Sequence, residues 1–126
     1  MGHLDAEVLV YGCRGNDLRL LARALGSSGM KLRAADSGTE FVRHAVSGRP
    51  SAVVLGVGTA SIADLRMISL IQAINSDLPA IIVAEDESLE LERSARQANI
   101  FYYLVHPIDD SELHAVLEDL MRHSRG

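Results

Sequence analysis

The chain has 126 residues, a net charge of −5 at neutral pH and 48% hydrophobic residues. This length suits a single folded domain, and the acidic balance argues against nucleic-acid binding, which depends on neutralising phosphates. No apolar run reaches the roughly 18 residues that cross a bilayer, and the first residues lack the basic and apolar segments of a secretion signal. We therefore expect a cytoplasmic protein with one domain over residues 1–126, which binds neither nucleic acid nor membrane.

Short apolar runs predict five β-strands, at about 7–11, 30–35, 52–57, 80–84 and 101–105. The runs at 52–55 and 80–83 are apolar at every position rather than at alternate ones. A strand needs no polar face when helices cover both sides of a parallel sheet. These two runs therefore predict central strands of such a sheet.

Helical periodicity and capping signals predict helices at about 17–26, 38–47, 64–75, 88–98 and 110–123. The first and last helices carry apolar residues at the spacing i, i+3, i+4, i+7, namely Leu18, Leu21, Ala22 and Leu25, and Leu113, Val116, Leu117 and Leu120. Two helix starts pair a cap residue with an acid three positions later, Ser37 with Glu40 and Asp109 with Glu112. The alternation of strand and helix predicts a three-layer α/β fold.

In a doubly wound sheet, the functional crevice lies beyond the carboxyl ends of the strands. The residues at these predicted ends are Gly12, Cys13, Gly56, Ala84 and His106. Cys13 is the only cysteine, so the chain contains no internal disulfide.

Three segments carry a resemblance to a known family: the first strand at 8–11, the strand-to-helix turn at 35–40 and the strand with its proline turn at 103–108. Together, and at this spacing, they resemble the receiver domain of two-component response regulators (CheY-like proteins) along essentially the whole chain. The resemblance implies a flavodoxin-like (βα)5 fold with strand order 2-1-3-4-5.

The resemblance also implies where phosphorylation chemistry would lie. The family's nucleophilic aspartate falls on Gly56, its magnesium-binding acids on Gly12 and Cys13, its hydroxyl residue on Ala84 and its lysine on His106. Glycine and alanine supply no carboxylate that attacks a phosphoryl group, and Mg²⁺ prefers oxygen ligands. We therefore expect an atypical, phosphorylation-independent receiver (a pseudo-receiver) in signal transduction or transcription control, with no catalytic residue, metal ion or cofactor.

In the family, partner contacts lie on the fourth helix, fifth strand and fifth helix. The resemblance therefore marks Tyr102 and Tyr103 as interaction residues, toward a protein partner or a covalently linked output domain and in a homodimer. The acids at 85–92, followed by Arg93 and Arg96, form a surface of both charges that would orient such a partner. Strand alternation predicts that Tyr102 faces away from Phe101 and Tyr103.

Other interpretations remain open. Cys13 and His106 form either a reactive thiol–imidazole pair, for redox sensing, or a buried thiol beside an inert histidine. The glycines at the strand ends either admit a small ligand into the crevice or serve backbone turns. A third alternative is phosphotransfer at His106 or Asp86.

Overall fold

A computed structural model describes residues 6–57, 62–85, 89–97 and 100–125 of the chain. Five parallel strands form one sheet in the order β2-β1-β3-β4-β5, as predicted, and five helices alternate with them. In chain order the elements are β1 (Glu7–Tyr11), α1 (Gly15–Ser27), β2 (Lys31–Ala34), α2 (Gly38–Ser47), β3 (Ala52–Val57), α3 (Ile62–Ile74), β4 (Ala80–Ala84), α4 (Leu89–Gln97), β5 (Tyr102–Val105) and α5 (Asp110–Arg125).

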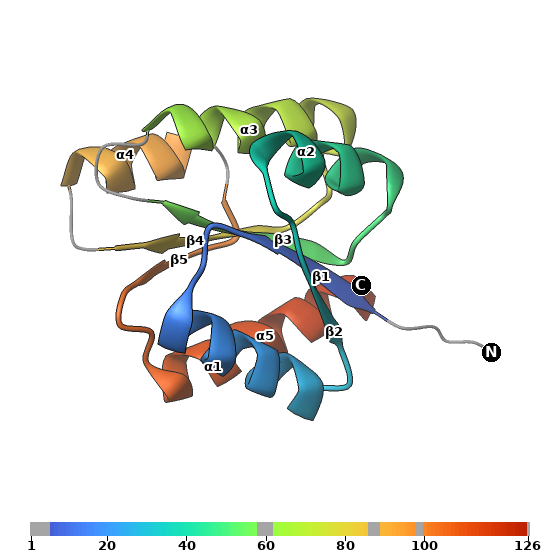
Figure 1. The fold of residues 1–126 in the computed structure, drawn as a ribbon, viewed down its shortest axis with the longest axis vertical. Helices are drawn as coiled ribbons and strands as arrows, with labels where there is room; N and C mark the ends of the chain where they lie inside the picture. Colours follow the sequence, from blue (N-terminus) through green and yellow to red (C-terminus); the bar gives the residue numbers. More distant parts are fainter. Residues whose placement is uncertain (1–5, 58–61, 86–88, 98–99, 126) are drawn as a thin grey trace.

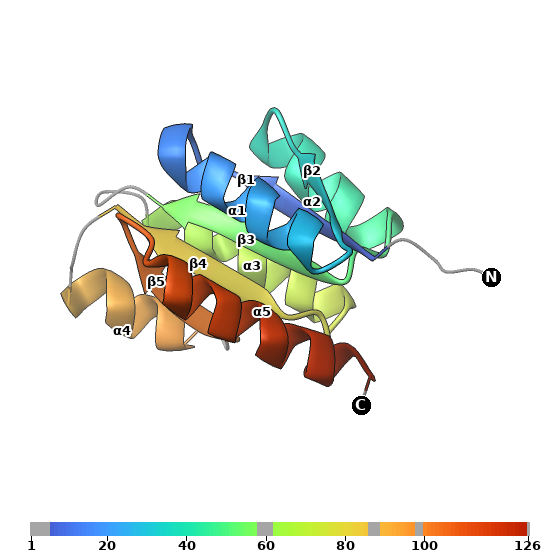
Figure 2. The ribbon, with the colours of Figure 1, turned by 90° about the horizontal axis from the view of Figure 1, so that it is seen from below.

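The sheet lies between two helical layers: α2, α3 and α4 cover one face, and α1 and α5 cover the other (Figures 1 and 2). Alternate residues of each strand enter opposite cores. Val8 and Val10 pack on the α1–α5 side, whereas Leu9 packs with Phe41 of α2 on the other side. Every residue of β4 is buried, as expected for a central strand covered on both faces.

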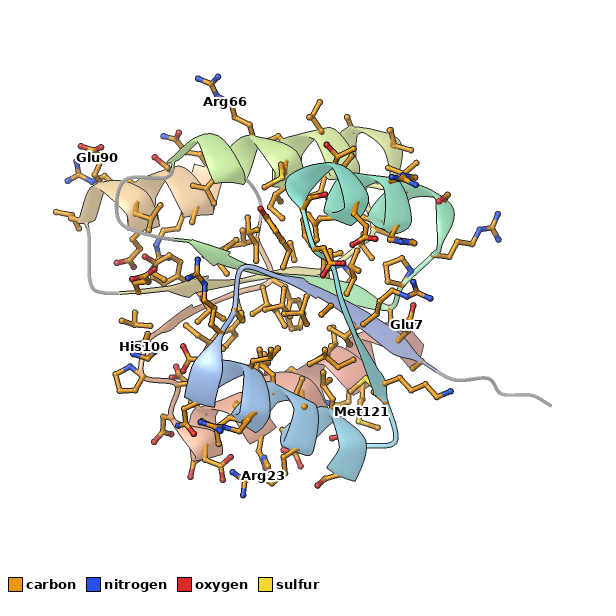
Figure 3. All side chains as sticks on the ribbon, viewed as in Figure 1. Glu7, Arg23, Arg66, Glu90, His106 and Met121 are labelled. Carbon is orange, nitrogen blue, oxygen red and sulfur yellow. The ribbon has the colours of Figure 1, made fainter. Side chains whose placement is uncertain are left out.

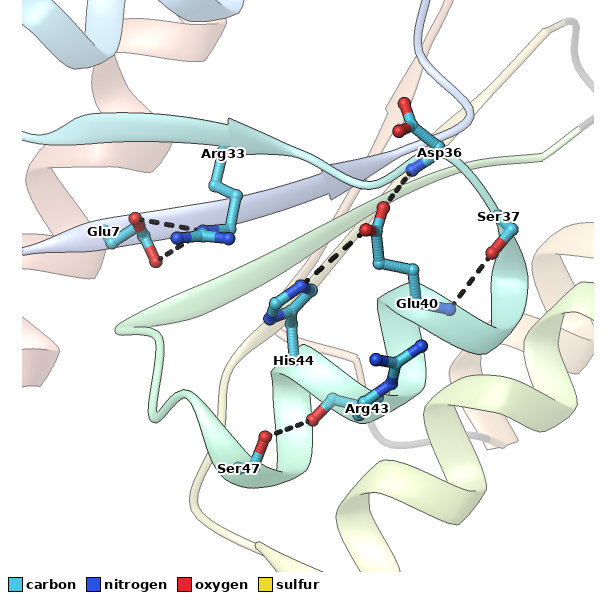
Figure 4. Close-up of polar contacts among 8 residues, drawn as sticks. All are labelled: Glu7, Arg33, Asp36, Ser37, Glu40, Arg43, His44 and Ser47. Atoms are coloured by element: carbon cyan, nitrogen blue, oxygen red, sulfur yellow. Dashed lines mark hydrogen bonds and ion pairs between the residues drawn. The ribbon is translucent and has the colours of Figure 1, made fainter.

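The predicted cap residues, Ser37 and Asp109, are confirmed at two helix starts, and the returning carboxylate is seen at α2. At α2, Ser37 Oγ accepts a hydrogen bond from the Glu40 amide at 3.1 Å, and the Glu40 carboxylate accepts one from the Asp36 amide at 2.6 Å (Figure 4). At α5, Asp109 accepts from the Glu112 amide at 2.8 Å. The bonds from the Glu40 and Glu112 amides satisfy donors that a helix leaves unpaired at its N-terminus.

The apolar faces of the first and last helices differ in how well they follow the prediction. All four predicted residues of α5 are buried. In α1, Leu21 and Leu25 are buried, but Leu18 is only half-buried and Ala22 is exposed, so the expectation for Ala22 is wrong. The buried face of α1 instead includes Ala24 and an acid, Asp17.

The fifth strand also departs from the prediction, because it begins at Tyr102 and not at residue 101. Phe101 therefore lies outside the strand alternation and packs with Tyr102 against the α1–α5 core. Tyr103 packs against the opposite core, so the predicted shared face of Phe101 and Tyr103 is wrong.

β2 is an edge strand of four residues, and it is largely exposed. It pairs only with β1, and Arg33 reaches across to Glu7 of that strand with a nitrogen–oxygen distance of 3.3 Å (Figure 4). Within the described ranges, no helix is long and apolar enough to cross a membrane.

Candidate functional site

The five residues predicted at the strand ends lie together. Gly12, Cys13, Gly56, Ala84 and His106 all line one pocket of about 300 Å³ at the carboxyl edge of the sheet. The same pocket is also lined by Arg14, Asp17, Val83 and Glu85. The parallel sheet places them there because all its strands end on the same edge.

Gly12 and Gly56 lie in direct backbone contact in this pocket. β1 pairs with β3 in register, with Tyr11 opposite Leu55, so the residues that follow are neighbours. A Cβ atom on Gly56 would lie 2.6 Å from the Gly12 carbonyl oxygen, and one on Gly12 would lie 2.5 Å from the Gly56 carbonyl oxygen. Gly12 also has φ of +89°, which favours glycine. Neither position has room for a side chain.

Asp17 is a site residue that the sequence analysis did not identify. It lies in the first turn of α1, it is 7% exposed, and its Oδ2 atom lies 2.6 Å from Nδ1 of His106. The Ile108 amide also donates to Asp17 Oδ1, at 3.4 Å. Because an ionised carboxylate only accepts hydrogen bonds, Nδ1 of His106 carries the proton in this contact. His106 itself is half-exposed after β5, where Figure 3 labels it.

The sequence contains a signal for the burial of Asp17, but the position of this acid in the first turn of a helix has a simpler local explanation. An acid in the first turn of a helix complements the helix dipole, so its default role is local. Asp17 is spaced i, i+4, i+7 and i+8 with Leu21, Ala24 and Leu25, the buried face of α1. That spacing would have placed the carboxylate against the core, where a partner is required.

Cys13 is a partly buried thiol beside this acid. Burial, which removes the thiolate from water, and the negative charge of Asp17 together raise the pKa of Cys13 to about 12. A reactive cysteine has a pKa lowered by nearby positive charge. His106, the residue suggested as its partner, is hydrogen-bonded to Asp17 instead.

The predicted interaction residues divide into two groups. Tyr102, Tyr103 and Arg96 line a second pocket, of about 520 Å³, together with Ile100, Phe101 and Glu112. Arg96 is also paired with Glu92 on its own helix, at 2.6 Å. Arg93 is exposed on α4 but does not line this pocket.

A family model described as the response regulator receiver domain matches residues 16–118 of the chain. The chain belongs to this family. Similar curated proteins are transcriptional regulatory proteins: PrrA of Mycobacterium tuberculosis, 28% identical over 96% of this chain, and GlrR of Escherichia coli K12, 25% identical over 98% of it. The receiver domain spans 52% of the length of PrrA and 28% of that of GlrR.

Solved receiver structures share the fold. The signal receiver domain of an HD domain-containing protein from Pseudomonas fluorescens Pf-5 superposes with a TM-score of 0.82, at 21% identity, over 97% of this chain and 98% of that one. The chemotaxis protein CheY4 of Vibrio cholerae superposes with a TM-score of 0.76, at 16% identity, over 93% and 99% of the two chains. The chain is thus a receiver domain of two-component signalling or transcription control.

The side chains lining this receiver's pocket do not fit a magnesium ion. Mg²⁺ is held by carboxylates and water in an octahedral arrangement. Gly12, Gly56 and Ala84 supply no ligand, and Cys13 is a protonated thiol. Of the two described acids in the pocket, Asp17 is bonded to His106, which leaves Glu85. Among the described residues no three His, Cys, Asp or Glu side chains group as metal ligands.

We predict opposite effects for alanine at two glycines. Gly56→Ala should lower the free energy of unfolding by about 1–3 kcal/mol, because its Cβ overlaps backbone that has no room to move. Gly26→Ala is the matched control: nothing lies within 4 Å of its Cβ, and helix propensity should raise stability by about 0.5–1 kcal/mol. Urea denaturation measures both, and equal effects would contradict the close backbone contact.

We predict that Asp17→Ala lowers the free energy of unfolding by about 2 kcal/mol, since it removes a buried carboxylate that accepts hydrogen bonds. Asp119→Ala removes an acid from an exposed pair with Arg122 and should cost less than about 0.5 kcal/mol. Urea denaturation of both variants makes the comparison. A cost for Asp17→Ala as small as for Asp119→Ala would show that the contact with His106 is unimportant.

We predict that Cys13 resists alkylation. With a pKa of about 12 rather than 9.0, iodoacetamide at pH 8 should react about a thousandfold more slowly with the folded protein than with the urea-unfolded chain. The rate for the folded protein should still be rising at pH 10. A rate that levels off below pH 9 would show a stabilised thiolate.

The raised pKa of Cys13 also predicts the direction in which stability changes at alkaline pH. Between pH 9.0 and about 12 only the unfolded chain loses the Cys13 proton, so the contribution of this thiol to the free energy of unfolding falls as pH rises. The stability difference between the wild type and Cys13→Ala should therefore shift against the wild type from pH 8 to pH 10.

Proposed function

We propose that this chain is a phosphorylation-independent receiver that acts through protein contacts rather than by phosphoryl transfer. The observation that carries the proposal is the backbone contact between Gly12 and Gly56. In the family resemblance, the phosphoacceptor aspartate falls on Gly56. The Gly12 carbonyl oxygen occupies the space into which such a side chain would extend.

The rest of the pocket supports this reading. Phosphoryl transfer to a carboxylate requires the nucleophile and a divalent cation that neutralises the transferring oxygens. The pocket side chains do not fit that cation, and Ala84 has no hydroxyl group for the phosphoryl oxygens. His106 stands where the family carries lysine, and its Nδ1 is held by Asp17.

The redox alternative has less support than binding. A thiol with a pKa of about 12 is protonated at neutral pH, and a protonated thiol is a poor nucleophile. The 300 Å³ pocket remains a place for a small ligand, but no described contact favours a particular chemistry.

The proposed partner is a protein, or an output domain linked to this one as in the longer relatives. PrrA and GlrR are transcriptional regulatory proteins, and this domain spans only part of each.

We propose a homodimer through α4, β5 and α5. The pocket lined by Tyr102, Tyr103 and Arg96 supports this choice, because tyrosine and arginine often anchor interfaces.

The test is incubation of the protein with acetyl phosphate and Mg²⁺, followed by intact-mass spectrometry. We expect no phosphate adduct, because among the described residues no pocket carboxylate lies in a group of side chains that could hold a cation. A receiver that carries the aspartate, treated in the same tube, shows that the donor is active.

Sedimentation of the same samples should give a dimer that is unchanged by the donor and dissociated by Tyr102→Ala.

A phosphate adduct on the wild type would overturn the proposal. Loss of that adduct in a His106→Gln variant would assign the acceptor to His106 and favour phosphotransfer there. Asp86, the other acceptor considered from the sequence, lies outside the described residues. A monomer at all concentrations would overturn the dimer alone.

A further inference from the structure

The outer face of α3 is unusually apolar for a surface helix. Its inner residues Leu65, Ile68 and Ile71 are buried against the sheet. On the outer side, Leu70 is 59% exposed and Ile74 is 67% exposed. Surface helices normally keep polar residues on the side away from the core. This face therefore presents apolar area for which the described part of the chain provides no cover.

The exposed residues Leu70 and Ile74 lie on the same side of α3 as Met67, which lines a pocket between α2 and α3. Met67, Leu70 and Ile74 are spaced i, i+3 and i+7, so they lie along one side of α3. Met67 contacts the start of α2, where its sulfur would lie 3.1 Å from a Cβ on Gly38. Met67 also lines a pocket of about 700 Å³ with Gly38, Thr39, Val42 and Arg43. We call this pocket, with Leu70 and Ile74, the α2–α3 groove.

Two arginines lie near the apolar residues of this groove. Arg43 lines its pocket from α2, whereas Arg66 projects outward from α3, one turn before Leu70 (Figure 3). Within the described part of the chain, neither guanidinium group takes part in an ion pair or a side-chain hydrogen bond. The contact that Figure 4 draws at Arg43 involves its backbone, because Ser47 Oγ donates to the Arg43 carbonyl oxygen at 2.8 Å.

The nearby acid of α2 does not neutralise this border. Glu40 accepts from the Asp36 amide and faces His44, with 3.8 Å between the charged atoms. Among the described residues, no acidic side chain lines the pocket of the α2–α3 groove. The groove thus combines an apolar floor with two arginines that pair with no described acid.

We propose that the α2–α3 groove binds an amphipathic helix of a protein partner, with acidic residues beside its apolar stripe. Grooves between helices commonly bind helices through apolar anchors spaced i, i+3 or i+4, and i+7. Met67 to Ile74 covers about 10 Å along α3, which three turns of a partner helix exceed. A bilayer surface would leave the groove unfilled, and nucleic acid gains little from an apolar floor. The inference rests on the proposed role of this receiver in protein binding, but it uses neither the pocket nor the α4–β5–α5 face.

The test uses two synthetic 18-residue helical peptides with the same leucine stripe, flanked by glutamate in one and by lysine in the other. Fluorescence anisotropy measures their binding to the full chain. The glutamate peptide should bind at least about tenfold more tightly, because it pairs with Arg43 and Arg66. Leu70→Ser and Ile74→Ser should each weaken it about tenfold, since each removes an apolar contact at the centre of the interface. Arg43→Glu should narrow or reverse the preference between the peptides.

Leu89→Ser is the matched control, because Leu89 of α4 is 67% exposed, like Ile74, but lies outside the groove. It should leave binding unchanged, and all variants should keep the wild-type urea midpoint. Equal affinity for both peptides, no binding, or equal loss with Leu89→Ser would overturn the proposal. So would binding to anionic vesicles that the groove variants abolish, which would assign the face to a membrane.

The two proposals fail separately. Loss of peptide binding without any phosphate adduct would reject the α2–α3 groove and leave the phosphorylation-independent role standing. A phosphate adduct with intact peptide binding would do the reverse.

Discussion

The pairing of β1 with β3 at the centre of the sheet constrains everything at its carboxyl edge. Because the pairing runs to Tyr11 opposite Leu55, the next residues, Gly12 and Gly56, are neighbours, and their backbones touch. Main chain therefore fills space that two side chains would otherwise need. No side chain lies between the two strands at this point, so the side chains that could carry chemistry come from the residues around the glycines.

On the opposite margin, Asp17 and His106 connect two distant parts of the chain. The carboxylate lies in the first turn of α1, and the imidazole follows β5, so the contact spans 89 positions in sequence. Asp17 is also the one acid or base found buried among the described residues. The contacts at the crevice, between the two glycine backbones and between Asp17 and His106, thus hold parts of the fold together. Such a structural role is consistent with binding surfaces elsewhere on the domain.

The fold was largely predictable because local signals and long-range pattern agree. Continuous apolar runs identify the buried strands, and the caps at Ser37 and Asp109 locate two helix starts. The convergence of the strand ends follows from parallel topology, so the pocket-lining residues were predictable as a group. Their contacts were not. Asp17 resembles an ordinary helix-start acid until α5 and β5 are placed beside it.

Other differences between prediction and structure arise at single residues near the ends or on the faces of elements. Phe101 lies one residue before β5, and strand alternation assigns a face only inside a strand. The face of α1 was misread at Ala22 because alanine and leucine count alike in an apolar pattern, whereas a buried aspartate does not count. The exposed apolar residues of α3 were not predictable either, because apolar residues lie on both its inner and its outer side and weaken the periodic signal that separates the faces.

The margin of the sheet at β2 limits how two such domains can associate. A strand at an edge has unpaired amides and carbonyls that invite another chain to extend the sheet. Here that strand has four residues and carries Lys31 and Arg33, and Arg33 forms an ion pair with Glu7 of β1. Short, cationic edges are poor templates for strand addition, so sheet-to-sheet polymers are disfavoured at this end. Fibril growth by strand addition at β2 is thereby disfavoured even at high protein concentration.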